Sequence, residues 1–400
     1  MVAAGLLVVV TGLGFGTSRA IASLSDGSSG QPASGATSTT IALGTTGDTG
    51  SSPTAGSSGA NTEETDAPFI PDGGGALPGS GAYNALACGD ESHCVAVGAD
   101  ATGAGIIGTT AQGGTSWANH VLPAGTPALG DVSCPDTAHC VAVGQGAILT
   151  TSNGGAQWAM HRPPVDKATL VGVACATASS CLSVGVSVNT TGPYSGQILA
   201  TSDGGSTWSV DSLPPGALGL GAVACPTATR CIAVGGEILT SDDGGQTWQI
   251  RTVAGGIGVL RSIACSSSSV CIALGPNPQS IENPLAPAIA IISRDGGTTW
   301  TKFAMPDQTA NVGRVACASA SSCFAVGPSM SGTVAPLFAS NDGGVTWQPA
   351  PAPGSMTDIA DIACPSATEC VSVGHAGGQP AVVQTINGTS TVASAPVAAP

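Results

Sequence analysis

The sequence predicts an all-β fold, a seven-bladed β-propeller with four antiparallel strands in each blade. Two observations predict it. A cysteine pair with five intervening residues (C-x5-C) occurs seven times, and an eight-residue motif, usually ending in tryptophan, follows each pair. The pairs recur at intervals of 40 to 52 residues, a period typical of propeller repeats. Each repeat would therefore supply one blade.

The cysteine pairs predict adjacent strands joined by disulfides. An apolar run such as LGAVAC precedes each pair, and a β-branched run such as CIAVG follows it. Opposed residues of antiparallel strands lie close enough to be bridged, and an even cysteine count is typical of disulfides in exported chains. The predicted bridges are Cys88–Cys94, Cys134–Cys140, Cys175–Cys181, Cys225–Cys231, Cys265–Cys271, Cys317–Cys323 and Cys364–Cys370.

A metal site is the alternative interpretation of these pairs. Zinc sites usually separate paired cysteines by two to four residues and add a second ligand pair nearby. Only two of the seven loops contain a histidine, His93 or His139. Redox chemistry of the thioredoxin type needs C-x-x-C, and the chain has no P-loop or H-E-x-x-H sequence. We therefore expect neither a metal nor a cofactor.

The eight-residue motif resembles the Asp-box, or BNR repeat, with the pattern S-x-D-x-G-x-T-W. SDDGGQTW at 241–248 carries the whole pattern, and TSDGGSTW at 201–208 differs only by threonine for serine. Two earlier copies replace the aspartate with Gln112 and Asn153, and the worn seventh copy at 385–392 lacks the tryptophan. The repeat covers about four-fifths of the chain.

We expect this motif to be scaffold. Asp and Asn side chains cap turns by accepting backbone N–H bonds, glycine supplies positive φ, and tryptophan packs between neighbouring sheets. A catalytic carboxylate would occur once or twice, and the spacing lacks the dense oxygen ligands of the alternative, a calcium loop. The residues with this expected structural role are Asp203, Trp208, Asp243, Trp248, Asp295, Trp300, Asp342 and Trp347.

The N-terminal residues 1–22 are predicted to be a signal peptide or an anchor. Their apolar run is shorter than the ~20 residues of a membrane span, and Ala20-Ile21-Ala22 offers a cleavage site. Residues 23–80, rich in Ser, Gly, Thr and Pro, are predicted to form a flexible linker. The propeller would occupy residues 81–400. We expect an extracellular protein, either secreted or tethered by its N-terminal segment.

The charge balance excludes two classes of partner. The formal net charge is −15, with only nine Lys and Arg residues. Nucleic acid binding needs a basic surface, and an anionic membrane surface would also repel this chain. The expected partner is a protein or a glycan, and we expect a monomer.

The motif and repeat number resemble the sialidase-like propeller superfamily. Its BNR-type families include sialidases, tandem-propeller xyloglucanases, sortilin-type receptors and photosystem II assembly factors. The resemblance to sialidases implies an F/Y-R-I-P sequence, but Phe69 stands where the arginine should be in Pro68-Phe69-Ile70-Pro71. None of the arginines stands in the sequence context that sialidases use for their substrate-binding arginines. A xyloglucanase-type site lies between two propellers, and only one is predicted here.

Three charged residues are candidate catalytic residues. Asp131 and Asp361 each stand three residues before the first cysteine of a pair, and Arg314 takes the same position in the sixth repeat. They would meet at one end of the central channel, where two carboxyl groups about 5–9.5 Å apart could support glycosidase chemistry. We favour a structural interpretation, in which Arg314 and Asp361 form a salt bridge between blades.

The variable loops are the predicted binding surface. Alternating connections place the C-x5-C turns and the eight-residue motifs on one face, and the remaining loops, whose lengths vary, on the other. Insertions on a rigid scaffold often carry binding function. The alternative is that these loops are extra length that the fold tolerates and that has no function. The candidate binding residues are Tyr194, Pro276, Asn277, Glu282, Asn283 and Met330.

These observations favour a non-catalytic, exported binding module of a bacterial-type cell surface. A glycoside hydrolase of the sialidase type is the alternative, and an assembly-factor role is a third possibility that rests on resemblance only.

Overall fold

The computed structural model describes residues 81–165, 168–187, 195–310, 312–328, 335–352, 356–376, 379–386 and 389–393. The chain divides into residues 1–65 and 66–400, and every described residue belongs to the second unit. The predicted signal segment and linker therefore lie outside the described residues. Within the described ranges, no helix has the length and apolar character needed to cross a membrane.

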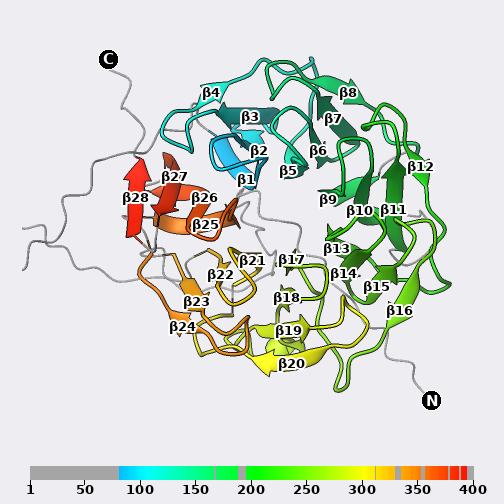
Figure 1. Cartoon of the computed structure of the whole chain (residues 1–400), viewed down its shortest axis with the longest axis vertical. Coiled ribbons are helices and arrows are strands. Elements are labelled where there is room, and N and C mark those ends of the chain that lie inside the picture. Colours follow the sequence, from blue (N-terminus) through cyan, green and yellow to red (C-terminus); the bar gives the residue numbers. More distant parts are fainter. Residues whose placement is uncertain are drawn as a thin grey trace, which may run out of the picture. The chain divides into compact units, whose positions relative to one another are not determined.

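The described residues form seven antiparallel sheets of four strands each, which confirms the predicted fold class. The sheets follow one another around a ring in sequence order (Figure 1). Within each blade, the four strands are consecutive in the sequence. The first strand of every blade contacts the first strands of both neighbouring blades, so these strands surround the central channel.

The strands have the following bounds. Blade 1 contains β1 (Gly81–Cys88), β2 (Cys94–Asp100), β3 (Gly105–Thr110) and β4 (Ala118–Asn119), and blade 2 contains β5 (Leu129–Ser133), β6 (Cys140–Gly144), β7 (Ala147–Thr151) and β8 (Ala159–His161). Blade 3 contains β9 (Thr169–Cys175), β10 (Cys181–Ser187), β11 (Ser195–Thr201) and β12 (Ser209–Val210), and blade 4 contains β13 (Leu220–Ala224), β14 (Cys231–Gly235), β15 (Ile238–Ser241) and β16 (Gln249–Arg251). Blade 5 contains β17 (Ser262–Cys265), β18 (Cys271–Gly275), the 3-10 helix η1 (Pro278–Ile281), β19 (Ile289–Ser293) and β20 (Thr301–Ala304). Blade 6 contains β21 (Arg314–Cys317), β22 (Cys323–Val326), β23 (Leu337–Ser340) and β24 (Gln348–Pro349), and blade 7 contains β25 (Met356–Ala363), β26 (Glu369–Ala376), β27 (Gln379–Ile386) and β28 (Thr389–Ala393).

The repeated apolar run after the second cysteine of each pair forms the second strand of each blade. The five residues of β14, CIAVG, are all buried, because both faces of the sheet pack against neighbouring blades. The core consists of seven apolar clusters, each between two adjacent blades. In one of them, Trp248 of blade 4 packs with Leu182 and Val184 of blade 3.

All seven predicted disulfides form, which confirms the pairing. Each bridge closes the turn between the first and second strands of its blade. In blade 4, Gly244 of the eight-residue motif donates a 2.8 Å hydrogen bond to the carbonyl of Thr229 in the C-x5-C turn. Five other blades make the same bond. The two kinds of turn therefore lie together, as predicted, on what we call the turn face.

The opposite face carries the loops between second and third strands and the links between blades, and we call it the loop face. At the ring closure, Tyr83 and Leu86 of blade 1 pack with Val371, Val373 and Val382 of blade 7. In the described part of the chain, blade 1 uses β1–β4 and blade 7 uses β25–β28, so no described strand is exchanged across this seam.

Candidate functional site

The three catalytic candidates all lie on first strands, beside the channel. Asp131 is in β5, Arg314 begins β21, and Asp361 is in β25. All three are partly exposed. The prediction that they share the channel thus agrees with their place in the fold, but their detailed contacts differ from the expectation.

Each carboxylate is bonded to the backbone of the next blade. Oδ2 of Asp131 accepts a 2.8 Å hydrogen bond from the N–H of Val173, and Oδ2 of Asp361 accepts one of 2.9 Å from Leu86. Ser262 makes the corresponding bond without a charge, with its Oγ accepting from Val315 at 3.1 Å. The residue three positions before the first cysteine therefore bonds its blade to the next one. We call this side-chain-to-backbone hydrogen bond the inter-blade latch.

The predicted salt bridge between Arg314 and Asp361 is wrong. It is absent from the ion pairs within 4.0 Å among the described residues. Asp361 bonds to the N–H of Leu86 instead, and Arg314 influences it only at longer range. The sequence places both residues correctly on neighbouring first strands, but it does not reveal which backbone group lies nearer to the carboxylate.

The two carboxyl groups and Arg314 interact electrostatically. Burial raises the pKa of Asp131 to about 7, the Arg314 guanidinium opposes this rise, and the negative charge of Asp361 adds to it. Burial also raises the pKa of Asp361, again opposed by Arg314. A carboxyl group with a pKa near neutrality is suited to general acid–base chemistry. This raised pKa is the one chemical feature of the site that agrees with the glycosidase alternative.

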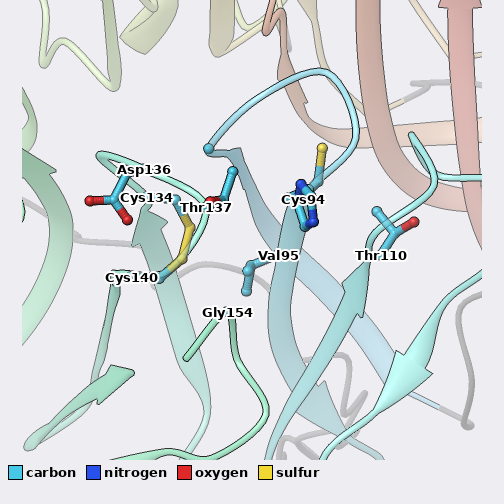
Figure 2. A pocket seen from close by; sticks show the side chains of 10 residues that line it. Cys94, Val95, Thr110, Cys134, Asp136, Thr137, Cys140 and Gly154 are labelled. Atoms are coloured by element: carbon cyan, nitrogen blue, oxygen red, sulfur yellow. A yellow bond between two sulfur atoms is a disulfide. The ribbon is translucent and has the colours of Figure 1, made fainter. Parts of the chain in front are cut away.

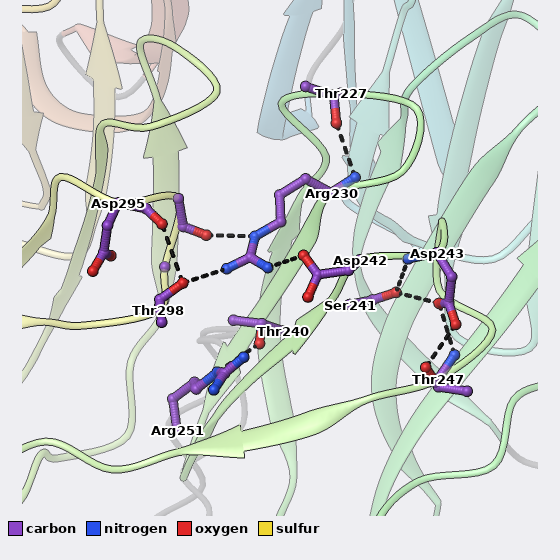
Figure 3. Close-up of polar contacts among 12 residues, drawn as sticks. Thr227, Arg230, Thr240, Ser241, Asp242, Asp243, Thr247, Arg251, Asp295 and Thr298 are labelled. Atoms are coloured by element: carbon purple, nitrogen blue, oxygen red, sulfur yellow. Dashed lines mark hydrogen bonds and ion pairs between the residues drawn. The ribbon is translucent and has the colours of Figure 1, made fainter.

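On the turn face, the aspartates of the eight-residue motif are engaged within their own turns. Oδ1 of Asp243 accepts hydrogen bonds from the Ser241 hydroxyl at 2.7 Å and the Thr247 N–H at 2.9 Å, and Oδ2 accepts from the Thr247 hydroxyl at 2.6 Å (Figure 3). The Thr207 hydroxyl bond, followed by the Thr207 N–H, lowers the pKa of Asp203 to about 2. These contacts account for the recurrence of Ser, Asp and Thr in the pattern.

The tryptophans of the motif do not all make the same hydrogen bond. Nε1 of Trp208, Trp300 and Trp347 donates to the carbonyl of the second glycine of the same motif, at 2.9 Å in each case. Trp158 and Trp248 make no such bond, and the Nε1 of each is buried without a hydrogen-bond partner. The surroundings of these two indoles therefore differ from those of Trp208, Trp300 and Trp347.

Two arginines use the turn face to connect blades. Arg230, from the C-x5-C turn of blade 4, donates to the carbonyl of Gly296 and the hydroxyl of Thr298 in blade 5 and pairs with Asp242 (Figure 3). Arg294 reaches from blade 5 to the carbonyl of Asp342 in blade 6.

A small cavity lies between the turns of blades 1 and 2. Cys94, Val95 and Thr110 line it from blade 1, and the Cys134–Cys140 disulfide lines it from blade 2 (Figure 2). Its volume of about 10 Å³ is room for a single water molecule. Across the described part of the chain, no group of three His, Cys, Asp or Glu residues is arranged to hold a metal ion.

The predicted binding residues fall partly in one loop of blade 5. Oδ1 of Asn277 accepts from the N–H of Gln279 and caps η1, and Oδ1 of Asn283 accepts from the N–H of Leu285. These two side chains therefore hold the loop in shape, while Glu282 is exposed. Pro276 is also in this loop, directly before Asn277. Tyr194 and Met330 lie outside the described residues.

Sequence reasoning missed a pocket of about 290 Å³ on blade 3. Gln197 lines it and is only 5% exposed, and Asp211 lies beside it with a pKa raised by burial to about 6. The available signal was the glutamine inside the strand sequence SGQILAT. The pocket is lined by Val165, Ser195, Gly196, Gln197, Val210, Asp211 and Leu213.

No protein-family model and no curated protein sequence matches the chain. Among solved structures, it is similar to YCF48 from Cyanidioschyzon merolae, with a TM-score of 0.55 and 16% identity, covering 78% of this chain and 97% of that one. An ancestral GH74 enzyme gives a TM-score of 0.58 and 10% identity over 81% of this chain but 47% of the enzyme. A chain of the mitotic checkpoint complex gives 0.57 and 9%, covering 82% and 96%. At these identities the similarity establishes the fold, a seven-bladed β-propeller.

Proposed function

We propose that this chain is an exported, non-catalytic β-propeller that binds a protein partner through its loop face. The observation that carries the proposal is the distribution of exposed apolar side chains. Among the described residues, four large apolar side chains are exposed on the loop face, three on outer strands and none on the turn face. Those on the loop face are Val121, Leu218, Val259 and Leu285.

Apolar side chains exposed on one face support a protein-binding role for that face, because apolar groups form the centres of protein–protein contacts. The similar chain in the mitotic checkpoint complex belongs to a protein assembly, and it supports a partner-binding role by analogy of fold only. The resemblance of the eight-residue motif to the Asp-box supports membership of the BNR propellers. The hydrogen bonds of the motif aspartates support a scaffold role for them.

Export is supported by the seven disulfides, since such bridges persist in oxidising compartments. We infer that residues 1–22 direct export and that residues 23–80 link this segment to the propeller.

A glycoside hydrolase of the sialidase type is the second candidate. The raised pKa of Asp131, beside Asp361 and Arg314, is the observation that favours it. The inter-blade latch opposes it, because one oxygen of each carboxylate is already bonded to the scaffold.

Two assays on the purified chain separate these functions. Fluorogenic sialosides and β-glucosides, together with a glycan array, should show neither turnover nor binding. Turnover that survives repurification and disappears in Asp131→Asn or Asp361→Asn would overturn the non-catalytic proposal. Binding to the array without turnover would replace the protein partner with a glycan.

Photo-crosslinking tests the face directly. A photoreactive amino acid is placed at Leu218, Val259 or Leu285 on the loop face, and at Gln246 on the turn face, in the cells that produce the protein. A discrete adduct from the loop-face positions alone is expected. Equal adducts from Gln246 would contradict the proposed face.

A further inference from the structure

The pocket on blade 3 lies where β11 and β12 meet the links to the neighbouring blades. Val165, from the link before blade 3, and Val210 and Leu213, from the end of β12 and the link after it, give it apolar walls. Gln197 and Asp211 contribute the main polar groups. Val210 is 52% exposed, so the apolar lining continues onto the open surface.

Three buried hydrogen-bond acceptors of blades 3 and 4 have no partner. Oε1 of Gln197, Oδ2 of Asp211 and Oε2 of Glu237 are all buried and have no hydrogen-bond partner in the described structure. Most buried polar atoms in native proteins are bonded, and an exception calls for an explanation. All three atoms are acceptors, so a donor or a cation would satisfy them; beside Asp211, the buried and unpartnered Nε1 of Trp248 is one such donor.

The strand register shows that the blade scaffold does not require these polar groups. Gln197 lies opposite Gly185 in blade 3, and the N–H of Gly235 bonds to the carbonyl of Glu237 at the corresponding place in blade 4. The residues at this position in blades 1, 2, 5 and 7 are the apolar Ile106, Ala147, Ile289 and Ala381. Among these six blades, only blades 3 and 4 therefore carry an amide or carboxyl group at this position.

Within the described part of the chain, the carboxyl group of Asp211 has no cationic partner. Burial raises its pKa to about 6, the nearby Trp248 indole opposes the rise, and the charge of Asp243 adds to it. Asp211 and Trp248 nevertheless make no hydrogen bond of normal geometry. Asp211 is also absent from the ion pairs of the described residues. At pH 7.4 it is mainly ionised, and a partly buried, unpaired carboxylate attracts a cation.

The surface around the pocket fits a protein segment. A volume of 290 Å³ is at the lower limit for small-molecule sites and holds one or two aliphatic side chains. Leu218, which is 48% exposed, borders it: its carbonyl lies against Gly196 and its side chain against Gly236. The apolar surface thus leads from the pocket toward the hairpin that carries Glu237.

We propose that the pocket bounded by Val165, Gln197, Val210, Asp211 and Leu213 binds a basic, aliphatic segment of a protein partner. An aliphatic side chain fills the apolar pocket, a lysine or arginine pairs with Asp211, and an N–H or ammonium donor reaches Gln197. The net charge of −15 favours a basic partner over an acidic one. This inference rests on the proposed binding function and specifies its partner.

Labelled peptides provide the first test. We would measure binding of fluorescein-labelled Gly-Gly-Leu-Lys-Leu-Gly-Gly to the full chain by fluorescence polarisation, beside peptides with glutamate for lysine and serine for both leucines. A dissociation constant below about 1 mM is expected for the lysine peptide, with binding at least about tenfold weaker for the other two. In amide NMR spectra, the side-chain NH₂ signal of Gln197 should move on addition of the lysine peptide.

Variants then assign binding to the pocket. Asp211→Asn and Gln197→Leu preserve side-chain volume and should each weaken binding of the lysine peptide, whereas Met160→Ser should not. Met160 is a matched control because, like Val210, it is exposed two residues after the tryptophan of its motif. Circular dichroism and melting temperature would establish that each variant folds.

Three outcomes would overturn the inference: no binding of the lysine peptide at millimolar concentration, equal binding of the lysine and glutamate peptides, or unchanged binding in folded Asp211→Asn. None of them decides the proposed function, which the loop-face crosslinks test independently. Crosslinks that persist at Val259 and Leu285 in Asp211→Asn would leave the binding function in place and remove only this pocket from it.

Discussion

Oδ2 of Asp361 on blade 7 accepts a 2.9 Å hydrogen bond from the N–H of Leu86 on blade 1, across the seam where the ring closes. Among the described strands, none crosses this seam. The ring is therefore closed by apolar packing and by side-chain-to-backbone bonds such as this one. The same latch recurs between blades 2 and 3 at Asp131 and between blades 5 and 6 at Ser262.

Removing the latch at the seam should destabilise the propeller. Asp361→Ala leaves the N–H of Leu86 without a partner, which costs about 1–3 kcal/mol. Asp361→Asn keeps an acceptor at the same place and should therefore be more stable than Asp361→Ala. Differential scanning calorimetry of the two variants at pH 7.5 measures the difference. Equal melting temperatures for Ala and Asn would show that the latch contributes nothing.

The disulfides should stabilise each blade by similar amounts. Every bridge closes a short turn of the same length, for which the chain-entropy model gives roughly 2 kcal/mol. The double variants Cys88→Ala/Cys94→Ala and Cys225→Ala/Cys231→Ala should therefore lower the melting temperature comparably, and dithiothreitol should lower it further in both. A melting temperature of the native chain that dithiothreitol leaves unchanged would contradict a stabilising role.

In the eight-residue motif, asparagine should substitute well for aspartate. Oδ1 of Asn153 in blade 2 accepts a 3.0 Å bond from the N–H of Gln157, the counterpart of the bond from Thr247 to Asp243. Asp243→Asn should therefore retain most of the stability, whereas Asp243→Ala should lose about 1 kcal/mol because the turn loses its acceptors. Urea unfolding compares the two. A loss for Asn as large as that for Ala would mean that the charge, and not the acceptor, holds the turn.

The blades, the disulfides and the composition of the two faces follow from the sequence, because each depends on a local pattern that repeats. The inter-blade contacts do not. Arg314 and Asp361 stand at equivalent positions of adjacent repeats, yet the stagger between blades brings the N–H of Leu86 to Asp361. Gln197 was missed for a similar reason. Only the pairing with Gly185 shows that it occupies a buried position that is apolar in most other blades.

The pH dependence of stability distinguishes a latch from a functional carboxyl group at Asp131. Its folded-state pKa of about 7 lies above the ordinary value of 3.8. The folded state therefore binds the proton more tightly, and the stability that protonation contributes is present below pH 3.8 and is lost as pH rises toward 7. Asp131→Asn keeps an acceptor for Val173 but carries no charge.

The Asn variant should consequently melt at a higher temperature than the native chain at pH 8, and this gain should shrink as pH falls to 4. Each pKa unit corresponds to about 1.4 kcal/mol, and partial exposure of the side chain reduces the gain at pH 8 to about 1–2 kcal/mol. Calorimetry of both proteins from pH 4 to pH 8 measures it, with Ser262→Ala as a control that has no titrating group. A gain that does not vary with pH would show that Asp131 keeps an ordinary pKa. A gain in melting temperature that grows with pH would mean that the negative charge of Asp131 destabilises the fold. The hydrogen bond does not require this charge, since Ser262 makes the same bond without one.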